Sequence, residues 1–387
     1  MKIIDIFFLA LRNQIYGGSE NSAIQKECLQ KEEKDLQNLY KLSKAHDLAH
    51  LVAQALDTNG LLDDSKVATQ FRATRNLAIY RYEQMQYEFE QICLAFDEEK
   101  IPYMPLKGAI VRKYYPEPWM RTSCDIDILV RNEDLARAGE VLKSKLDYTF
   151  AERALHDVSY YSPSGVHLEL HFGLTELNEK FSAVVKDIWD ICQKQENSYC
   201  HTMTNELFLT YHIAHMAGHF RYGGCGIRPF LDLWLLKNKM PYDKVETERL
   251  LAEFGLTEFA KNAFLLSDIW FDNAKHTEVT RDLEEYIVGA GVYGSLENKV
   301  AVLQDEKKGG FRYVLSRIFL PYKKMKRLYP KLEKAPILLP FYHVKRWLLF
   351  LFKKDKKRAF AELKYSSSIS DEKKERIATL RKNLGLK

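Results

Sequence analysis

CDIDILV, the stretch from Cys124 to Val130, alternates acidic and apolar residues and therefore predicts a β-strand. Side chains two residues apart share one face of a strand, so Asp125 and Asp127 point to one side while Ile126 points to the other. Two neighbouring carboxylates repel each other unless a cation lies between them, and Mg²⁺ prefers oxygen ligands. The stretch predicts a metal-binding pair, although Asp-x-Asp alone is also typical of a solvated strand edge.

A third acidic residue lies in VHLELHF, residues 166–172. Glu169 is at the centre of this apolar strand, where an acid is costly unless it has a partner. His167 and His171 share its face. Three carboxylates on adjacent strands can hold two metal ions for in-line phosphoryl chemistry, so Glu169 is a candidate third metal ligand.

A turn precedes the acidic strand. The apolar run IPYMPLKG ends in Lys107-Gly108, 17 residues before Asp125. The turn opens a short helix that Pro116 ends, and the first amides of a helix can receive a phosphate. Arg121 lies four residues before Asp125, where its charge could reach a triphosphate.

Helical and strand-like segments alternate around these residues. Apolar patterns predict helices over residues 20–99, over Asn132–Leu146 with Asn132 as the cap, and from 175 to about 300. Residues 147–153 and 156–165 are typical of strands, and the second ends in a Ser-Pro-Ser-Gly turn. The order predicts an α+β unit of about 100 residues.

We expect an α+β core with a small mixed sheet, flanked by N- and C-terminal helical regions. The expected ranges are an N-terminal helical region at 1–100, the core at 101–200, a C-terminal helical domain at 201–305 and a basic, amphipathic tail at 306–387. The six cysteines contain no Cys-x-x-Cys pair, which favours a reducing compartment. We interpret the stretch MKIIDIFFLALRNQIYGG as an amphipathic helix and not as a signal peptide, so we expect a cytoplasmic location.

The set LKG, R-x3-DIDILV and ELH resembles the nucleotidyltransferase superfamily of DNA polymerase beta, which has a polymerase beta-like α+β core. Within it, the chain looks like the bacterial uncharacterised nucleotidyltransferases that carry an LKG turn. The superfamily pattern is a Gly-Gly or Gly-Ser turn, then Asp-x-Asp/Glu, then a later acid. The resemblance places Gly108 and Ala109 in the turn, Asp125 and Asp127 at the metal pair and Glu169 at the third acid.

The resemblance covers residues 101–175 and implies metal-dependent transfer of a nucleoside monophosphate from an NTP, ATP among them, to an acceptor hydroxyl with release of pyrophosphate. One Mg²⁺ or Mn²⁺ held by Asp125 and Asp127 would bind the triphosphate. A second, shared with Glu169, would activate the acceptor hydroxyl; alternatively, Glu169 is the general base. The residues expected to contact the nucleotide are Lys107, Gly108, Arg121 and His171.

Two departures from the superfamily pattern leave an alternative open. A single glycine follows Lys107, and Ala109 replaces the usual serine. The missing hydroxyl removes one phosphate contact, which Lys107 could replace electrostatically. The alternative is a catalytically inactive nucleotide-binding module.

Polar residues among the helices also have structural interpretations. His212, His215 and His219 fall on one helical face, and we interpret them as hydrogen-bonded residues at the edge of the core. Substrate contact by His215 or His219 is the alternative. Asp232 lies among apolar residues, and we interpret it as the acid of a buried salt bridge with Arg228.

The net charge of +5 hides a division along the chain. Residues 307–387 contain 24 Lys and Arg and 6 Asp and Glu, a net of +18, which leaves −13 for residues 1–306. The apolar run near residue 340 is too short and too interrupted to span a bilayer. The tail could lie on an anionic membrane as a peripheral anchor, bind a nucleic acid such as RNA, or dock on the acidic body. A protein that acts mainly through membrane or RNA docking by this tail is a further alternative.

Overall fold

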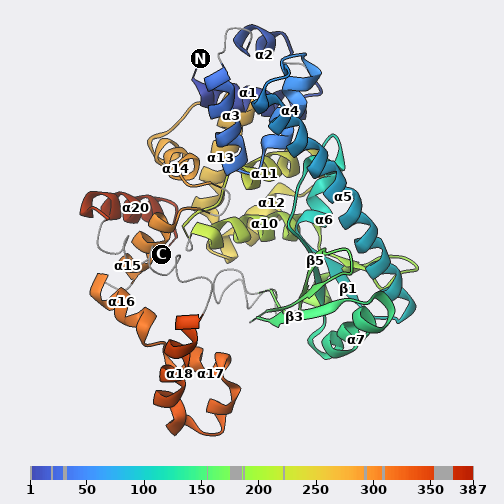
Figure 1. The fold of residues 1–387 in the computed structure, drawn as a ribbon, viewed down its shortest axis with the longest axis vertical. Coiled ribbons are helices and arrows are strands. Elements are labelled where there is room, and N and C mark those ends of the chain that lie inside the picture. Colours follow the sequence, from blue (N-terminus) through green and yellow to red (C-terminus); the bar gives the residue numbers. More distant parts are fainter. Residues whose placement is uncertain are drawn as a thin grey trace.

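The fold combines a small mixed β-sheet with a large assembly of helices (Figure 1). The computed structural model describes residues 2–18, 21–28, 33–154, 156–174, 185, 188–220, 223–291, 294–306, 310–352 and 369–386. The predicted α+β class, with a mixed sheet and helical flanks, is confirmed.

Five strands form the sheet in the order β1-β2-β5-β4-β3. They are β1 (Tyr103–Pro105), β2 (Asp125–Val130), β3 (Thr149–Arg153), β4 (Asp157–Tyr161) and β5 (His167–His171). β2 and β5 run parallel, and the other neighbouring pairs are antiparallel. A separate short pair consists of β6 (Gln193–Lys194) and β7 (His201–Thr202). All four strands predicted from the sequence are present.

One face of the sheet packs against two helices, α5 (Lys66–Glu98) and α7 (Leu135–Leu146). Ile126 and Ile128 of β2 and Leu168 of β5 are buried in this core. Since side chains alternate along a strand, the acidic residues of β2 and β5 lie on the opposite face. The alternation predicted for the acidic strand is confirmed.

Two sets of helices flank the sheet in the sequence. The first set is α1 (Ile3–Ile15), α2 (Asn21–Cys28), α3 (Glu33–Ala45) and α4 (Ala49–Thr58), followed by α5. The second set is α9 (Ile188–Ile191), α10 (Asn205–Phe220), α11 (Arg228–Lys239), α12 (Lys244–Glu253), α13 (Thr257–Asp272), α14 (Glu278–Val288) and α15 (Leu296–Glu306). Both sets contribute to one hydrophobic core, in which Phe7 of α1 and Phe230 of α11 are fully buried. The division of the chain into four ranges stays a prediction.

The starts of two helices differ from the prediction. Asn132 begins a 3-10 turn, η3 (Asn132–Asp134), and does not cap α7, whose N-cap is Asp134 without a side-chain bond. Short polar side chains compete for backbone bonds and favour such turns. The helix after the Lys-Gly turn is only α6 (Gly108–Val111), followed by the 3-10 turns η1 (Arg112–Tyr114) and η2 (Pro118–Met120). A helix of one turn has a weak dipole, so its amides offer less to a phosphate than expected.

Two parts of the basic tail are described. Residues 310–352, which we call the arm, consist of α16 (Gly310–Ile318), α17 (Tyr322–Leu328), the 3-10 turns η5 (Pro330–Glu333) and η6 (Pro336–Leu338), and α18 (Leu339–Phe352). Figure 1 shows the arm standing away from the sheet and from the N-terminal helices. In the ranges given above, no helix is both long and apolar enough to cross a membrane. The cytoplasmic location stays a prediction.

The second part is α20 (Asp371–Asn383), which packs against α14 and α15. Arg376 lies 2.8 Å from Asp282 and 2.6 Å from Glu285, and Lys373 lies 2.8 Å from Glu297. Docking on the acidic body, one of the three partners left open for the tail, therefore applies to α20.

Candidate functional site

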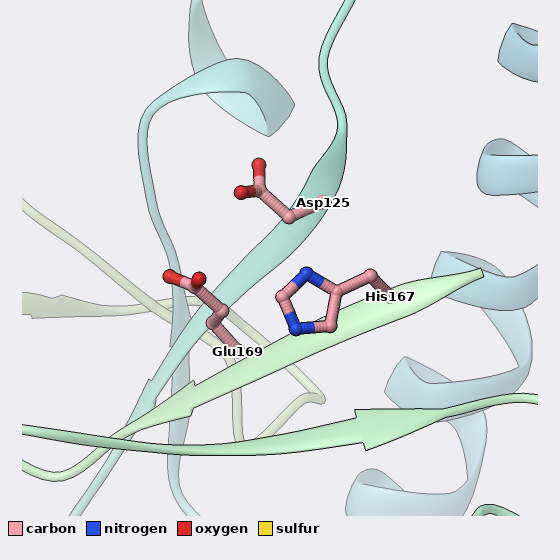
Figure 2. A group of neighbouring side chains, drawn as sticks. All are labelled: Asp125, His167 and Glu169. Atoms are coloured by element: carbon pink, nitrogen blue, oxygen red, sulfur yellow. The ribbon is translucent and has the colours of Figure 1, made fainter. Parts of the chain in front are cut away.

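The acidic residues predicted from the sequence come together on β2 and β5. The parallel pairing sets Asp125 opposite His167 and Asp127 opposite Glu169. All four side chains therefore rise from the same face of the sheet. Figure 2 shows Asp125, His167 and Glu169 around a common space. One donor atom from each of these three lies within 4.8 Å of the others.

A second group of donors overlaps with the first. Atoms of Asp127, Glu169 and His171 also lie within 4.8 Å of one another. His171 Nε2 is 2.8 Å from Asp127 Oδ1 and 3.5 Å from Glu169 Oε2. The Asp127 side chain is 6% exposed and that of Glu169 is 27% exposed. The cluster therefore has a buried end at Asp127 and His171 and an accessible end at Glu169.

Lys107 closes the buried end of the cluster. Its Nζ is 3.1 Å from Asp127 Oδ1. The Leu106 amide donates to the Asp127 carbonyl at 3.0 Å, which ties the turn to β2. The backbone φ of Lys107 is +42°, in a region that favours glycine and strains other residues. Such strain persists only where the surroundings fix the residue, and here they hold an ammonium group against the acids.

Gly108 is required by its neighbours. A Cβ at this position would lie 2.7 Å from Arg121 Nη1 and 3.5 Å from Arg112 Nη2. A larger residue would push these buried guanidinium groups out of place. The glycine therefore permits a close approach of side chains, and it does not itself adopt a positive φ.

The two aspartates differ in their electrostatic surroundings. Burial, together with the charges of Asp127 and Glu169, raises the pKa of Asp125 to about 6. Burial also acts to raise the pKa of Asp127, but the Lys107 charge and the His171 hydrogen bond outweigh it and hold that pKa well below its usual range. Asp125 makes no hydrogen bond or ion pair with any residue that the structure describes. Asp127 is thus tied to the protein's own cations, and Asp125 is not.

Negative charge exceeds positive charge in the cluster. Burial lowers the pKa of His171, but its bonds to Asp127 and Glu169 raise it to about 9, so the ring carries a proton at neutral pH. Asp157 of β4 pairs with His171 in the sheet, and burial and the Glu169 charge raise its pKa. An excess of carboxylates in a partly buried space attracts a cation.

Three carboxylates on adjacent strands, beside a Lys-Gly turn, form the arrangement that the sequence pattern predicts. A family model described as uncharacterised nucleotidyltransferase matches residues 32–272, which is more than half of the chain. The chain belongs to this nucleotidyltransferase family. No curated protein and no solved structure matches the chain. The matched part of the chain extends from α3 to α13 and contains the whole acidic cluster. Its bacterial branch stays a prediction.

Arg121 contacts an acid outside the cluster. Its Nη2 is 3.1 Å from Asp232 Oδ2, and the Tyr115 hydroxyl donates to Asp232 Oδ1 at 2.7 Å. The salt bridge predicted for Asp232 exists, but the prediction that Arg228 makes it is wrong, because Arg228 pairs with Asp47. A buried charge is costly unless it is paired, which explains why Asp232 holds the buried guanidinium of Arg121.

Arg112 is a basic residue that the sequence analysis did not single out. Its side chain is buried, its Nη2 donates to Ser123 Oγ at 3.0 Å, and no ion pair to it occurs in the described part of the chain. Burial and the charge of Arg121 lower its pKa to about 10, so it stays charged at neutral pH. Arg112 lines a cavity of about 80 Å³ together with Ser123 and Cys124, next to the acidic strand. Its position one helical turn after Gly108 was the available signal.

The histidines have several different surroundings. His212 is buried and bonds to the Pro229 carbonyl at 3.0 Å, which confirms the structural interpretation for this residue. His215 Nε2 and His219 Nε2 lie within hydrogen-bond distance of each other, at 3.0 Å, and substrate contact by either stays the untested alternative. His167 was expected only to share a face with Glu169. The parallel register that sets it beside Asp125 is long-range information, which spacing along one strand does not contain.

Proposed function

We propose that this chain transfers a nucleoside monophosphate from an NTP to an acceptor hydroxyl and releases pyrophosphate. The observation that carries the proposal is the donor group of Asp125, His167 and Glu169 on β2 and β5, with Asp127 beside it, in a chain of a nucleotidyltransferase family. Phosphoryl chemistry requires cations that neutralise the charge of the transferring phosphate, and an excess of carboxylates is how a protein holds them.

The donor atoms suit a divalent cation. Asp125, Asp127 and Glu169 offer oxygen atoms, which Mg²⁺ prefers. Mn²⁺ also suits these carboxylates, and His167 adds a nitrogen donor beside Asp125. A bound ion would neutralise the triphosphate and stabilise the charge that develops in the transition state. The nucleotide would approach from the accessible end of the cluster, at Glu169.

Two cationic residues beside the turn would orient the triphosphate. The Lys107 side chain is 21% exposed, so its ammonium can reach a phosphate at the edge of the cluster. Arg112 is buried and charged, and its Nη2 lies 3.5 Å from the Cβ position of Gly108. These two side chains would supply the phosphate contact that Ala109 lacks a hydroxyl to make. In this proposal Arg112 takes the role that the sequence suggested for Arg121.

Glu169 is the candidate general base. Its side chain is 27% exposed, so an acceptor hydroxyl could approach it, whereas the Asp127 side chain is only 6% exposed. Lys107 and His171 hold Asp127 ionised, so the negative field next to Glu169 is permanent. Glu169 would take the proton of the acceptor hydroxyl while the hydroxyl oxygen attacks the α-phosphorus, in line with the leaving pyrophosphate.

An inactive nucleotide-binding module is the second candidate. The observation that favours it is the ion pair between Lys107 and Asp127, in which an ammonium already contacts an oxygen that a metal ion would use. If this ion pair persists when the nucleotide is bound, the chain binds NTP and transfers nothing.

Two measurements separate the candidates. Titration calorimetry with NTPs, in the presence and absence of Mg²⁺ or Mn²⁺, measures nucleotide binding. An assay for pyrophosphate release then measures transfer. The transferase proposal predicts metal-dependent binding and release, with release lost in Asp125→Asn. The matched control Asp147→Asn removes an exposed acid outside the cluster and should leave both unchanged. Binding without release across a panel of acceptors would support the inactive module, and the absence of metal-dependent binding would contradict both candidates.

A further inference from the structure

The arm, residues 310–352, exposes a large share of the apolar surface. Of the 21 large hydrophobic side chains that are exposed in the described part of the chain, 12 belong to the arm. Scattered apolar side chains are normal on a protein surface, but a concentration of them marks a site of interaction with another molecule or with a membrane. Nucleotidyl transfer at β2 and β5 gives these side chains no role.

The exposed apolar side chains form a stripe on η6 and α18. Tyr342 of α18 is buried in the small core of the arm. Phe341, Val344 and Leu348 follow a spacing of three and four residues along another face of the same helix and are 62%, 47% and 54% exposed. Ile337, in the turn before the helix, is 88% exposed. The helix thus buries one apolar face in the arm and presents a second to solvent.

The arm is strongly basic as well. It contains ten Lys and Arg and one acid, Glu333, so its net charge is +9. Lys323, Lys324 and Lys331 are exposed, and none of them pairs with an acid among the described residues. Lys345 is exposed next to the apolar stripe, and its ammonium lies over the rings of Tyr329 and Tyr342, 6.0 and 5.9 Å from their centroids.

We propose that the arm binds the surface of an anionic lipid membrane. The stripe of Ile337, Phe341, Val344 and Leu348 enters the boundary between headgroups and acyl chains, and the basic side chains contact the headgroup charge. Helices that combine an apolar face with Lys and Arg bind membranes in this way. The 14 residues of α18 rise about 21 Å, less than the roughly 30 Å of the hydrocarbon layer, so the helix lies along the membrane.

Other occupants fit the arm less well. RNA is bound by basic residues together with aromatic rings that stack on bases. Of the 12 exposed apolar side chains of the arm, eight are aliphatic and four are aromatic, and three of the four side chains in the stripe are aliphatic. Two copies of the arm would bring together two surfaces of net charge +9, which repel each other. The acidic body is contacted by α20, which carries separate basic residues.

Co-sedimentation of the full chain with vesicles tests the proposal. We expect the chain to bind vesicles that contain phosphatidylglycerol, to bind pure phosphatidylcholine weakly, and to release from the anionic vesicles as salt is raised. The variant Ile337→Ser/Phe341→Ser/Leu348→Ser should bind at least about tenfold more weakly. The matched control Tyr80→Ser/Tyr87→Ser/Leu94→Ser removes three exposed apolar side chains of α5 and should bind as the wild type does. All six side chains are exposed, and circular dichroism checks that both variants remain folded.

Failure to sediment with anionic vesicles, or equal binding by the arm variant and the wild type, would overturn the proposal. If the wild type shifts the mobility of single-stranded RNA and does not bind vesicles, and only the arm variant loses this shift, the arm is assigned to nucleic acid instead. A dimer in light scattering that only the arm variant loses would assign it to a second copy. The residues of the acidic cluster are unchanged in these variants, so the result is independent of whether the chain transfers nucleotides.

Discussion

Two buried acidic sites lie within the matched range of the chain, and they differ in how their charge is balanced. Asp232 is fully buried, and Arg121 and Tyr115 each contact one of its carboxylate oxygens. Asp125 has other carboxylates as its neighbours and makes no ion pair in the part of the chain that the structure describes. One site is a closed ion pair, and the other is an open cluster of like charges.

The two sites shift the pKa of their acids in opposite directions. For Asp232, burial acts to raise the pKa, but the Arg121 charge outweighs it and the pKa is lowered. For Asp125, burial and the neighbouring acids raise the pKa to about 6. The fold therefore favours the charge of Asp232 and disfavours that of Asp125. A group whose charge opposes folding is a candidate for function, and one whose charge supports folding is a candidate for stability.

Replacing Asp125 should separate activity from stability most strongly. Asp125→Asn removes a proposed metal ligand, so pyrophosphate release should fall about 10⁴-fold, or roughly 5 kcal/mol in the barrier. Because the charge of Asp125 is repelled by its neighbours, the free energy of unfolding in urea, measured without metal, should stay the same or increase. A parallel loss of stability and activity would mean that Asp125 is structural, as Asp232 is.

The opposite result is expected for Asp232. Asp232→Asn leaves the Arg121 guanidinium buried without its counter-charge, which should lower the free energy of unfolding by roughly 3–5 kcal/mol. Urea unfolding measures this change. The affinity of the folded Asp232→Asn variant for the metal ion, measured by calorimetry, should be close to that of the wild type. A stable variant that fails to bind metal would remove the distinction between the two sites.

A smaller effect tests whether the open cluster also stores backbone strain. Lys107→Gly and Lys107→Met both remove the ammonium that contacts Asp127, but only glycine relieves the positive φ. Relief of the backbone strain stabilises Lys107→Gly, whereas the greater entropy of glycine in the unfolded chain destabilises it. The net effect should make Lys107→Gly about 1 kcal/mol more stable than Lys107→Met. Equal unfolding midpoints and slopes in urea would show that the turn is relaxed.

The smallest effect concerns pH. The folded-state pKa of Asp125 is raised, so its contribution to stability is fully present below its ordinary value of 3.8 and is lost as pH rises through about 6. The melting temperature of Asp125→Asn relative to the wild type should therefore increase between pH 4 and pH 7.5. Protons also compete with a metal ion for Asp125, so Mn²⁺ should raise the wild-type melting temperature less at pH 5 than at pH 7.5. A pH-independent difference would contradict the proposed surroundings of Asp125.

The sequence predicted the acidic cluster because its signals are local. Alternation along β2 and β5 fixed which side chains share a face, and the cost of burying Glu169 in an apolar strand pointed to a partner. Neither local signal brings β2 and β5 together, and that part of the prediction came from the resemblance to the superfamily pattern.

Partners that are far apart in the sequence were predicted less well. Asp232 forms its ion pair with Arg121, which is 111 residues away, and not with Arg228 of its own helix. This pairing depends on which charged side chains the fold buries together. The tail likewise contains two kinds of basic segment, α20 on the acidic body and the exposed arm, and total charge could not distinguish them.

Transfer of label from α-labelled NTPs is the most direct test that the open cluster is a nucleotidyltransferase site. A lysate supplies the acceptors, and the purified chain is added with Mg²⁺ or Mn²⁺. We predict a labelled product that the wild type and the control Asp147→Asn form and that Asp125→Asn/Asp127→Asn does not. Equal labelling by the double variant would contradict the account, because the two aspartates would then have no role in the transfer.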